Sequence, residues 1–167
     1  MASLYTTYDT CYRDFLSHYS FVISDIILRN WNVQDDNRIA VDDWIVHTFS
    51  NQPYKKNICL ALWDSSYVVG ICIWNTSEIY SLHVRKEYQN KGVGSLLLRD
   101  KLYENQKVRV LVDNTEAIRF YRRHGFDMHR PHPIVETVKV GNRVFTEYVL
   151  IRYSSTSNQE DDDRSTT

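Results

Sequence analysis

Apolar and polar residues alternate along the first part of the chain with the period of helices. From Asp9 to Asn30, apolar and aromatic side chains recur every three or four residues, the spacing of a helix that buries one face. These residues are Tyr12, Phe15, Leu16, Tyr19, Val22, Ile23, Ile26 and Ile27. The acidic stretch WNVQDDNRIAVDDW then reads as a loop, and VDDWIVHTFS fits a short second helix.

The middle of the chain changes to the period of strands. The segments NICLALWD and YVVGICIWN are separated only by Ser65 and Ser66, which predicts an antiparallel hairpin, and EIYSLHV follows as a third strand. Helical spacing returns in GVGSLLLRDKLYEN. The segment KVRVLVD reads as a buried strand, and TEAIRFYRRHG reads as a helix that ends near Gly125. The predicted order here is therefore β-α-β-α.

The end of the chain predicts a second hairpin and a tail. Alternating segments lie on either side of Gly141-Asn142 within FDMHRPHPIVETVKVGNRVFTEYVLIRY. The following SSTSNQEDDDRSTT has no apolar residue to anchor it, so we expect residues 154–167 to be disordered. With 167 residues and 43% hydrophobic content, the chain suffices for one sizeable core, so we expect one domain over residues 1–153.

Charge and cysteine content exclude several classes of protein. The formal net charge is −1, so no global positive field draws the chain to nucleic acid or to an anionic membrane. Cys11, Cys59 and Cys72 lie in apolar periodic segments and predict buried, reduced thiols. The sequence begins without a basic region followed by an apolar stretch, and no apolar run approaches membrane-spanning length. We therefore expect a cytoplasmic protein, with a nuclear location left open.

The segment QNKGVG, residues 89–94, joins the predicted strand EIYSLHV to the helix after it. Glycine lets the main chain approach a ligand closely, and the backbone N–H groups at the start of a helix favour an anion. The pattern matches neither the Walker loop nor the dinucleotide fingerprint. It predicts a site for a pyrophosphate.

Two segments together carry a family resemblance. LHVRKEYQNKGVGSLLL and, downstream, DNTEAIRFYRRHGF resemble the two central motifs of the GCN5-related N-acetyltransferase (GNAT) superfamily. The likeness is close from Glu78 to Phe126, and the order of elements agrees from Asp9 to Tyr153, although SLYTTY departs from the family's usual opening strand. The resemblance implies a single GNAT-like α/β domain, with a central, twisted, mostly antiparallel sheet flanked by helices. It also implies an acetyl-CoA-dependent N-acetyltransferase.

The resemblance assigns cofactor-binding roles to particular residues. The main chain around Leu82, His83 and Val84 would pair with the pantetheine arm of acetyl-CoA. The pyrophosphate would lie on the loop of Gln89, Asn90, Lys91, Gly92, Val93 and Gly94. Asn114 would contact the cofactor arm, and Tyr121 matches a tyrosine that commonly serves as the general acid.

Transfer to an amine also needs a group that accepts the amine's proton. Glu78 is the first candidate, because the histone-acetylating branch of the family has its base glutamate at this distance before the loop. Other relatives place a base on the next strand, but KVRVLVD offers Arg109 and no carboxylate before Asp113. A water chain and His83 remain alternatives. On a regular strand Glu78 and His83 would point to opposite faces, unless a bulge intervenes.

Other charged groups have simpler explanations beside the functional ones. The three histidines between residues 124 and 132 span a helix end and two prolines without a cysteine, so we expect packing or solvated side chains and no metal site. The three arginines of TEAIRFYRRHG, together with Lys91, are open candidates for the 3′-phosphate of CoA, although a charged helix face is usually only solvated.

The acceptor stays open. An acidic cluster with two tryptophans would suit a cationic amine, and a solvated loop explains it equally well. Its residues are Asp35, Asp36, Asp42, Asp43, Trp31 and Trp44. Small amines, polyamines, aminoglycosides, protein N-termini and lysine side chains all remain open as acceptors. The oligomeric state is also open, and a homodimer is one alternative. The alternative function is a non-catalytic acyl-CoA-binding module that acts in regulation or interaction.

Overall fold

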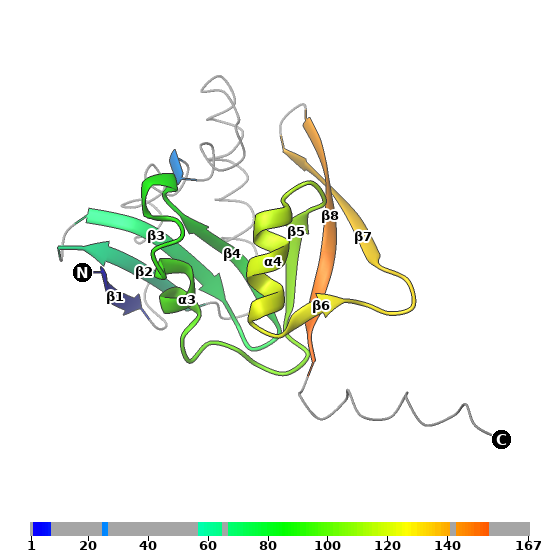
Figure 1. The fold of residues 1–167 in the computed structure, drawn as a ribbon, viewed down its shortest axis with the longest axis horizontal. Helices are drawn as coiled ribbons and strands as arrows, with labels where there is room; N and C mark the ends of the chain where they lie inside the picture. The colour runs from blue at the N-terminus through cyan, green and yellow to red at the C-terminus, as the bar shows by residue number, and fades with distance from the viewer. Residues whose placement is uncertain (1, 8–24, 27–56, 65–66, 141–142, 154–167) are drawn as a thin grey trace.

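The computed structural model describes residues 2–7, 25–26, 57–64, 67–140 and 143–153 (Figure 1). Several predictions from the sequence lie outside these ranges. They are the two early helices except residues 25–26, which are helical, together with Cys11, the acidic cluster with its tryptophans, and the tail from residue 154.

One mixed sheet organises the described chain. Its strands follow the order β1-β2-β3-β4-β5-β8-β6, and β7 also pairs with β8. Their bounds are β1 Ala2–Thr7, β2 Asn57–Trp63, β3 Tyr67–Trp74, β4 Glu78–Val84, β5 Lys107–Leu111, β6 Phe126–Met128, β7 Ile134–Val140 and β8 Arg143–Arg152. Every pair is antiparallel except β4 with β5, which is parallel. The single α/β domain with a mostly antiparallel sheet is thus confirmed.

The first half of the sheet contains the predicted hairpin and an opening strand. β2 and β3 pair antiparallel from Asn57↔Trp74 to Trp63↔Tyr67, as the alternation of their apolar residues predicts. β1 pairs with β2 along its whole length, so the SLYTTY segment forms a strand despite its short apolar pattern. Hydrogen bonding to a central strand therefore outweighs the weak local signal.

Helix α3 is shorter than the sequence predicts. It covers only Val93–Leu98, although the helical spacing runs on through GVGSLLLRDKLYEN. The chain turns at Asp100, whose φ is 60°, and Lys101 then points inward, 6% exposed. Its Nζ donates to the carbonyl of Arg99 and lies 5.2 Å from the centroid of the Trp74 ring. These tertiary contacts replace the last turns of the expected helix.

Helix α4, Thr115–Arg123, agrees with its prediction. Asn114 caps it by accepting a hydrogen bond from the N–H of Ala117 at 3.0 Å. Glu116 lies in the first turn and two arginines lie in the last, which complements the helix dipole. The buried face presents Ile118 and Tyr121 to the core.

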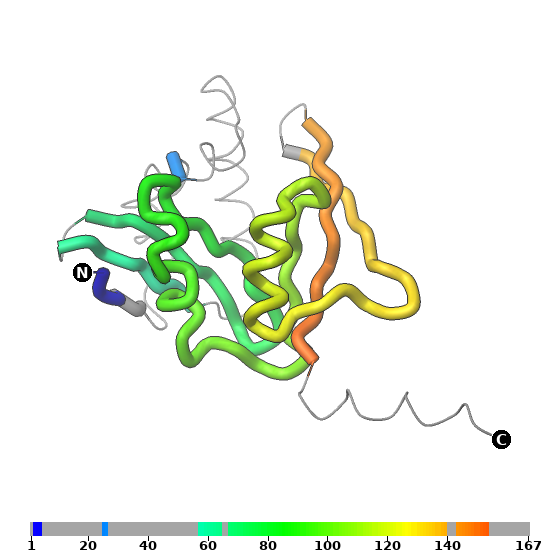
Figure 2. Tube along the Cα trace, viewed as in Figure 1, coloured from blue at the N-terminus to red at the C-terminus, as the bar shows by residue number. Residues whose placement is uncertain are grey.

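The C-terminal strands share one edge of β8. β7 pairs with β8 from Ile134↔Val149 to Val140↔Arg143, which confirms the second hairpin. β6 continues along the same edge by pairing Phe126 with Arg152, and residues 129–133 loop out between the two strands (Figure 2). β6 has only three residues, too short for a clear alternation, and the sequence did not single it out.

Apolar residues fill both faces of the sheet. One face packs against α3 and α4, with Leu97, Ile118 and Phe126 in a single cluster. The same cluster contains Cys59 and Cys72, which face each other across β2 and β3 as buried free thiols, so the prediction is confirmed for these two cysteines. Within the described ranges, no helix combines the length and the apolar content needed to cross a bilayer.

Candidate functional site

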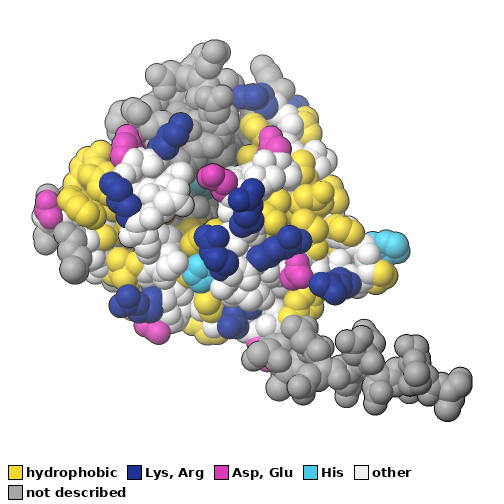
Figure 3. All heavy atoms as spheres, viewed as in Figure 1, with side chains coloured by type: hydrophobic (Ala, Val, Ile, Leu, Met, Phe, Trp, Pro, Cys, Tyr) yellow, Lys and Arg dark blue, Asp and Glu magenta, His cyan; other side chains and the backbone are white. Residues whose placement is uncertain are grey.

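The parallel strands β4 and β5 separate after a short contact. Only Glu78↔Lys107 and Ile79↔Val108 are in register, so β4 residues 80–84 and β5 residues 109–111 have no described strand between them. We call this region the strand opening. Figure 1 shows the two strands diverging toward their C-terminal ends, and the space-filling view is hollowed there, with charged side chains around the hollow (Figure 3). The strand opening exposes backbone groups to which an extended ligand can hydrogen-bond.

A bulge in β4 decides which side chains share a face. Trp74 of β3 is in register with Ile79, but Ile73 is in register with Ser81, so Tyr80 is the extra residue. The hydroxyl of Tyr80 accepts a hydrogen bond from Asn75 Nδ2 at 3.1 Å. Because the bulge shifts the alternation by one residue, Glu78 and His83 lie on the same face. The strand is therefore not regular, and the objection that these two residues point apart does not hold.

The loop QNKGVG lies at the C-terminal end of β4 and bends back onto it. Gln89 Nε2 donates to the carbonyl of Val84 at 3.0 Å. Asn90 and Gly92 have φ values of 58° and 79°, both in the left-handed region. Asn90, Lys91 and Gly92 are exposed, and no atom lies within 4 Å of the position that a Cβ on Gly92 would occupy. The first N–H groups of α3 follow directly and have no partner inside the helix.

The second glycine of this loop has a packing role. A Cβ on Gly94 would lie 3.0 Å from Cε2 of Phe120, a distance that real Cβ atoms rarely reach. Gly94 thus lets the start of α3 approach α4. The sequence did not anticipate this contact, because the two residues are far apart along the chain.

Tyr121 connects α4 to the strand opening. Its ring is 6% exposed and packs edge-on against Phe120 and Phe126. Burial raises the pKa of Tyr121 well above its usual value of 10.0, and the neighbouring Cys72 raises it further. Cys72 is in register with Leu82 of β4, so the phenol lies near the strand segment that borders the opening. At neutral pH this phenol is therefore protonated.

Glu78 is held by a network that the sequence revealed only in part. Its carboxylate forms an ion pair with Arg109, whose Nε is 2.6 Å from Oε2 of Glu136 on β7. Glu147 of β8 is in register with Glu136. Burial raises the pKa of Glu147, Arg109 lowers it, and Glu136 raises it. Glu136 and Glu147 were missed, since only the pairing of β7 with β8 brings them to β5.

His83 lies on the β4 face that it shares with Glu78. Burial lowers its pKa from 6.5 to about 4, because a partly dry site disfavours the charged imidazolium. The imidazole is therefore neutral at physiological pH. It can accept a proton there, although only weakly.

Asn114 and the remaining histidines have structural partners. The Oδ1 of Asn114 is occupied as the cap of α4, which leaves its Nδ2 as the group that could reach a ligand. His124 places Nδ1 2.8 Å from the carbonyl of Phe120 and stacks on its ring, whereas His129 and His132 are exposed. No group of His, Cys, Asp and Glu in the described chain is arranged to hold a metal ion.

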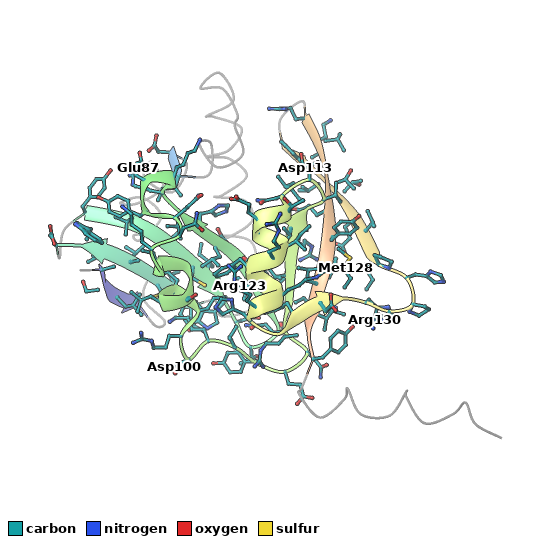
Figure 4. The ribbon with its side chains drawn as sticks, viewed as in Figure 1. Glu87, Asp100, Asp113, Arg123, Met128 and Arg130 are labelled. Atoms are coloured by element: carbon teal, nitrogen blue, oxygen red, sulfur yellow. The ribbon has the colours of Figure 1, made fainter. Side chains whose placement is uncertain are left out.

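Acidic groups lie on both sides of the strand opening. Figure 4 shows Glu87, within the 3-10 helix η2 Lys86–Tyr88, and Asp113, just beyond β5, at the same end of the molecule. On α4, Arg122 is paired with Asp127 at 3.2 Å, and Arg119 and Arg123 are exposed. The two exposed arginines stay available to a ligand phosphate.

Comparisons with known proteins agree with this geometry. Residues 55–128 match the family model for the acetyltransferase (GNAT) domain. A search of curated protein sequences finds no match.

Solved structures are similar over most of the chain. A GCN5-related N-acetyltransferase from Rhodopseudomonas palustris has 14% identity and a TM-score of 0.63, with 92% of this chain and 96% of that chain covered. The apo form of YjaB from Escherichia coli has 15% identity and a TM-score of 0.62, covering 90% and 97%. NAA60 from Arabidopsis thaliana, solved with a bisubstrate analogue, has 10% identity and a TM-score of 0.56, covering 92% and 98%. At such identities the likeness establishes the fold alone.

Proposed function

We propose that this chain, whose residues 55–128 match the acetyltransferase (GNAT) domain, is an N-acetyltransferase that moves the acetyl group of acetyl-CoA to a primary amine. The observation that carries the proposal is the separation of β4 from β5 directly before the QNKGVG loop. An extended thioester substrate can pair with the main chain of Leu82, His83 and Val84, while its pyrophosphate lies on residues 89–94.

The loop and the strand opening fit such a substrate. Gly92 is exposed with open space around its Cα, so a phosphate can approach the main chain closely. Lys91 is exposed beside it, with Nζ 5.4 Å from the centroid of the Tyr88 ring, and can add a positive charge. Asn114 contributes Nδ2 from the start of α4.

The reaction then needs two proton transfers. The amine nitrogen attacks the thioester carbonyl, a C–N bond forms and the C–S bond breaks. Tyr121, whose raised pKa keeps it protonated, donates to the departing sulfur. Glu78, His83 or an intervening water accepts the proton that the amine loses. The bulge helps, because it places Glu78 and His83 on one face of β4.

A second candidate function has one observation in its favour. Glu78 is engaged by Arg109, and a carboxylate held in an ion pair has fewer lone pairs for a substrate proton. A non-catalytic acyl-CoA-binding module, acting as a regulatory or interaction domain, would tolerate that arrangement. It would bind acetyl-CoA without consuming it.

A thiol-release assay separates the two functions. The purified chain is incubated with acetyl-CoA and a panel of alkyl amines, aminoglycosides and lysine peptides, and free CoA is followed over the background without acceptor. Acceptor-dependent release that saturates with amine is the expected result. Binding of acetyl-CoA by calorimetry, without release for any acceptor, would favour the non-catalytic module.

A further inference from the structure

One hydroxyl on β4 is enclosed without a partner. Ser81 is 4% exposed, and within the described chain its Oγ has no hydrogen-bond partner. Its register neighbour on β3 is Ile73, whose side chain offers no polar atom. Leaving a buried hydroxyl unpaired costs on the order of 1–3 kcal/mol. An unpaired hydroxyl on a strand that borders an opening points to a ligand group that completes it.

The same face carries an excess of carboxylates, formed by the residues around Arg109. Arg109 pairs with Glu78 and Glu136, and Glu147 is near enough for Arg109 and Glu136 to affect its proton affinity. Lys107 shares this face and is in register with Glu78. Among the described residues around Arg109, three carboxylates therefore face two cations, Arg109 and Lys107. We call Glu78, Arg109, Glu136 and Glu147 the glutamate network.

The bulge joins the two features. Without Tyr80 as the extra residue, Ser81 would point to the opposite face from Glu78. With it, Ser81 lies on the face of Glu78, three residues further along β4 and next to Leu82. Register neighbours of an antiparallel pair share a face, which puts Glu136 and Glu147 together on the β5 side of the strand opening.

From this juxtaposition we propose that the acceptor is an alkyl amine with a second ammonium group. Ser81 Oγ accepts a hydrogen bond from the reacting amine beside Leu82, and Glu136 and Glu147 of the glutamate network bind the second ammonium. This proposal rests on the proposed acetyl transfer and adds the class of its substrate. Ser81 acts on the reacting amine and the two glutamates act on the second ammonium. Variants of Ser81 and of the glutamates should therefore change the kinetics in different ways.

Two amines with the same five-carbon chain test the proposal. Cadaverine carries an ammonium at both ends, whereas n-pentylamine carries one ammonium and a methyl group. With the full chain and saturating acetyl-CoA, kcat/KM per amino group should be about tenfold higher for cadaverine, since a hydrogen-bonded charge is typically worth that much or more. The advantage should shrink as salt is added, because the network is partly exposed.

Variants then divide the two roles. Glu147→Gln should remove most of the preference for cadaverine, measured as the ratio of kcat/KM for the two amines, and Glu104→Gln, in the exposed turn before β5, should leave both amines unchanged. Ser81→Ala should lower kcat/KM about tenfold for both amines. Its melting temperature should stay the same or rise, because the substitution removes a hydroxyl that has no partner.

Some results would overturn the proposal. Equal kcat/KM for the two amines, or a preference that survives Glu147→Gln, would remove the second-ammonium site. Unchanged kinetics in Ser81→Ala would remove the hydroxyl contact. If neither amine releases CoA, calorimetry with cadaverine in the presence of CoA still decides. Binding lost in Glu147→Gln would support the site while contradicting acetyl transfer, and no binding would overturn the site itself.

Discussion

Tyr121 combines the two properties that a proton donor beside a thioester needs. Packing against Phe120 and Phe126 fixes the ring, and burial keeps the hydroxyl protonated. The hydroxyl has no hydrogen-bond partner among the described residues, so it is available to a substrate atom at the strand opening. Loss of this one oxygen would leave the aromatic packing intact.

Tyr121→Phe should therefore leave the affinity for acetyl-CoA almost unchanged and lower kcat. General acid catalysis is typically worth on the order of 10² to 10⁴ in rate, because the donor matters mainly as charge develops on the departing sulfur. Calorimetry and steady-state kinetics measure the two effects. Tyr103→Phe, at a partly exposed tyrosine, is the matched control. A kcat equal to wild type would demote Tyr121 to packing.

Glu78 differs from Tyr121 because its role is shared with a network. Arg109 holds its carboxylate on the face of β4 that also carries His83, and the backbone N–H of Glu78 is bound by Asn75 Oδ1 at 2.8 Å. The side chain is thus well oriented for a base, although one of its oxygens is engaged. Kinetics at several pH values shows whether the Glu78 carboxylate accepts the proton of the amine or only orients its neighbours.

Glu78→Gln should lower kcat/KM at neutral pH and recover partly at high pH, where the amine loses its proton without help. Glutamine keeps the shape of the side chain but no longer accepts a proton. Loss of the partly exposed ion pair should cost about 1 kcal/mol or less in unfolding free energy. Parallel pH profiles for variant and wild type would rule out Glu78 as the base, and His83→Gln would then be compared in the same way.

At the scale of elements, the connection between β4 and α3 is where we propose that the pyrophosphate binds. Gln89 donates a hydrogen bond to the carbonyl of Val84, and the left-handed residues Asn90 and Gly92 turn the chain. Gly94 then packs closely against the ring of Phe120. The two glycines thus serve different needs. Gly92 supplies the backbone conformation and access, and Gly94 supplies space between two helices.

Gly92→Glu should abolish the binding of acetyl-CoA, because the side chain would occupy the phosphate position and repel it. Gly92→Asn is the control for backbone strain, since asparagine tolerates the left-handed region and carries no charge. Gly94→Glu should also block binding, but with a lower melting temperature caused by the contact with Phe120. Calorimetry on folded Gly92→Glu with wild-type affinity would refute the loop as the pyrophosphate site.

At the scale of the whole molecule, the sheet consists of two halves joined by a two-residue parallel contact. His83 lies on β4 beyond this contact, where the two halves have separated, and it is partly enclosed there. A titratable group in such a position links the stability of the fold to pH. The folded state binds fewer protons than the unfolded chain wherever a histidine pKa is lowered.

His83 should therefore make the fold less stable in acid. Its pKa falls from 6.5 to about 4, so the stability it allows is complete above pH 6.5 and is lost progressively as the pH drops toward 4. At pH 5 the loss is on the order of 2 kcal/mol in unfolding free energy. Urea unfolding measures the free energy of unfolding at pH 7 and at pH 5. The drop in this free energy between the two pH values should be smaller for His83→Gln than for wild type. His129→Gln, at an exposed histidine, should lose as much unfolding free energy as wild type. An equal loss in wild type, His83→Gln and His129→Gln would contradict the burial of His83.

The sequence by itself determined the elements with strong local signals. Alternation in NICLALWD and YVVGICIWN predicted β2 and β3, and the periodic TEAIRFYRRHG predicted α4. QNKGVG followed by a helix pointed to an anion loop, because glycine positions and helix starts are properties of neighbouring residues. The single domain followed from chain length and hydrophobic content, and the mostly antiparallel sheet from the resemblance to the GNAT superfamily.

Tertiary structure decided whatever depends on residues distant in sequence. The end of α3 follows from Lys101 turning under Trp74, and the tight fit of Gly94 follows from Phe120 on another helix. The bulge at Tyr80, which puts Glu78, Ser81 and His83 on one face, is visible only in the register of β4 against β3. The glutamate network forms because β8 brings β7 to β5. Periodicity specifies which residues of one element share a side, whereas pairing between elements sets which side chains meet.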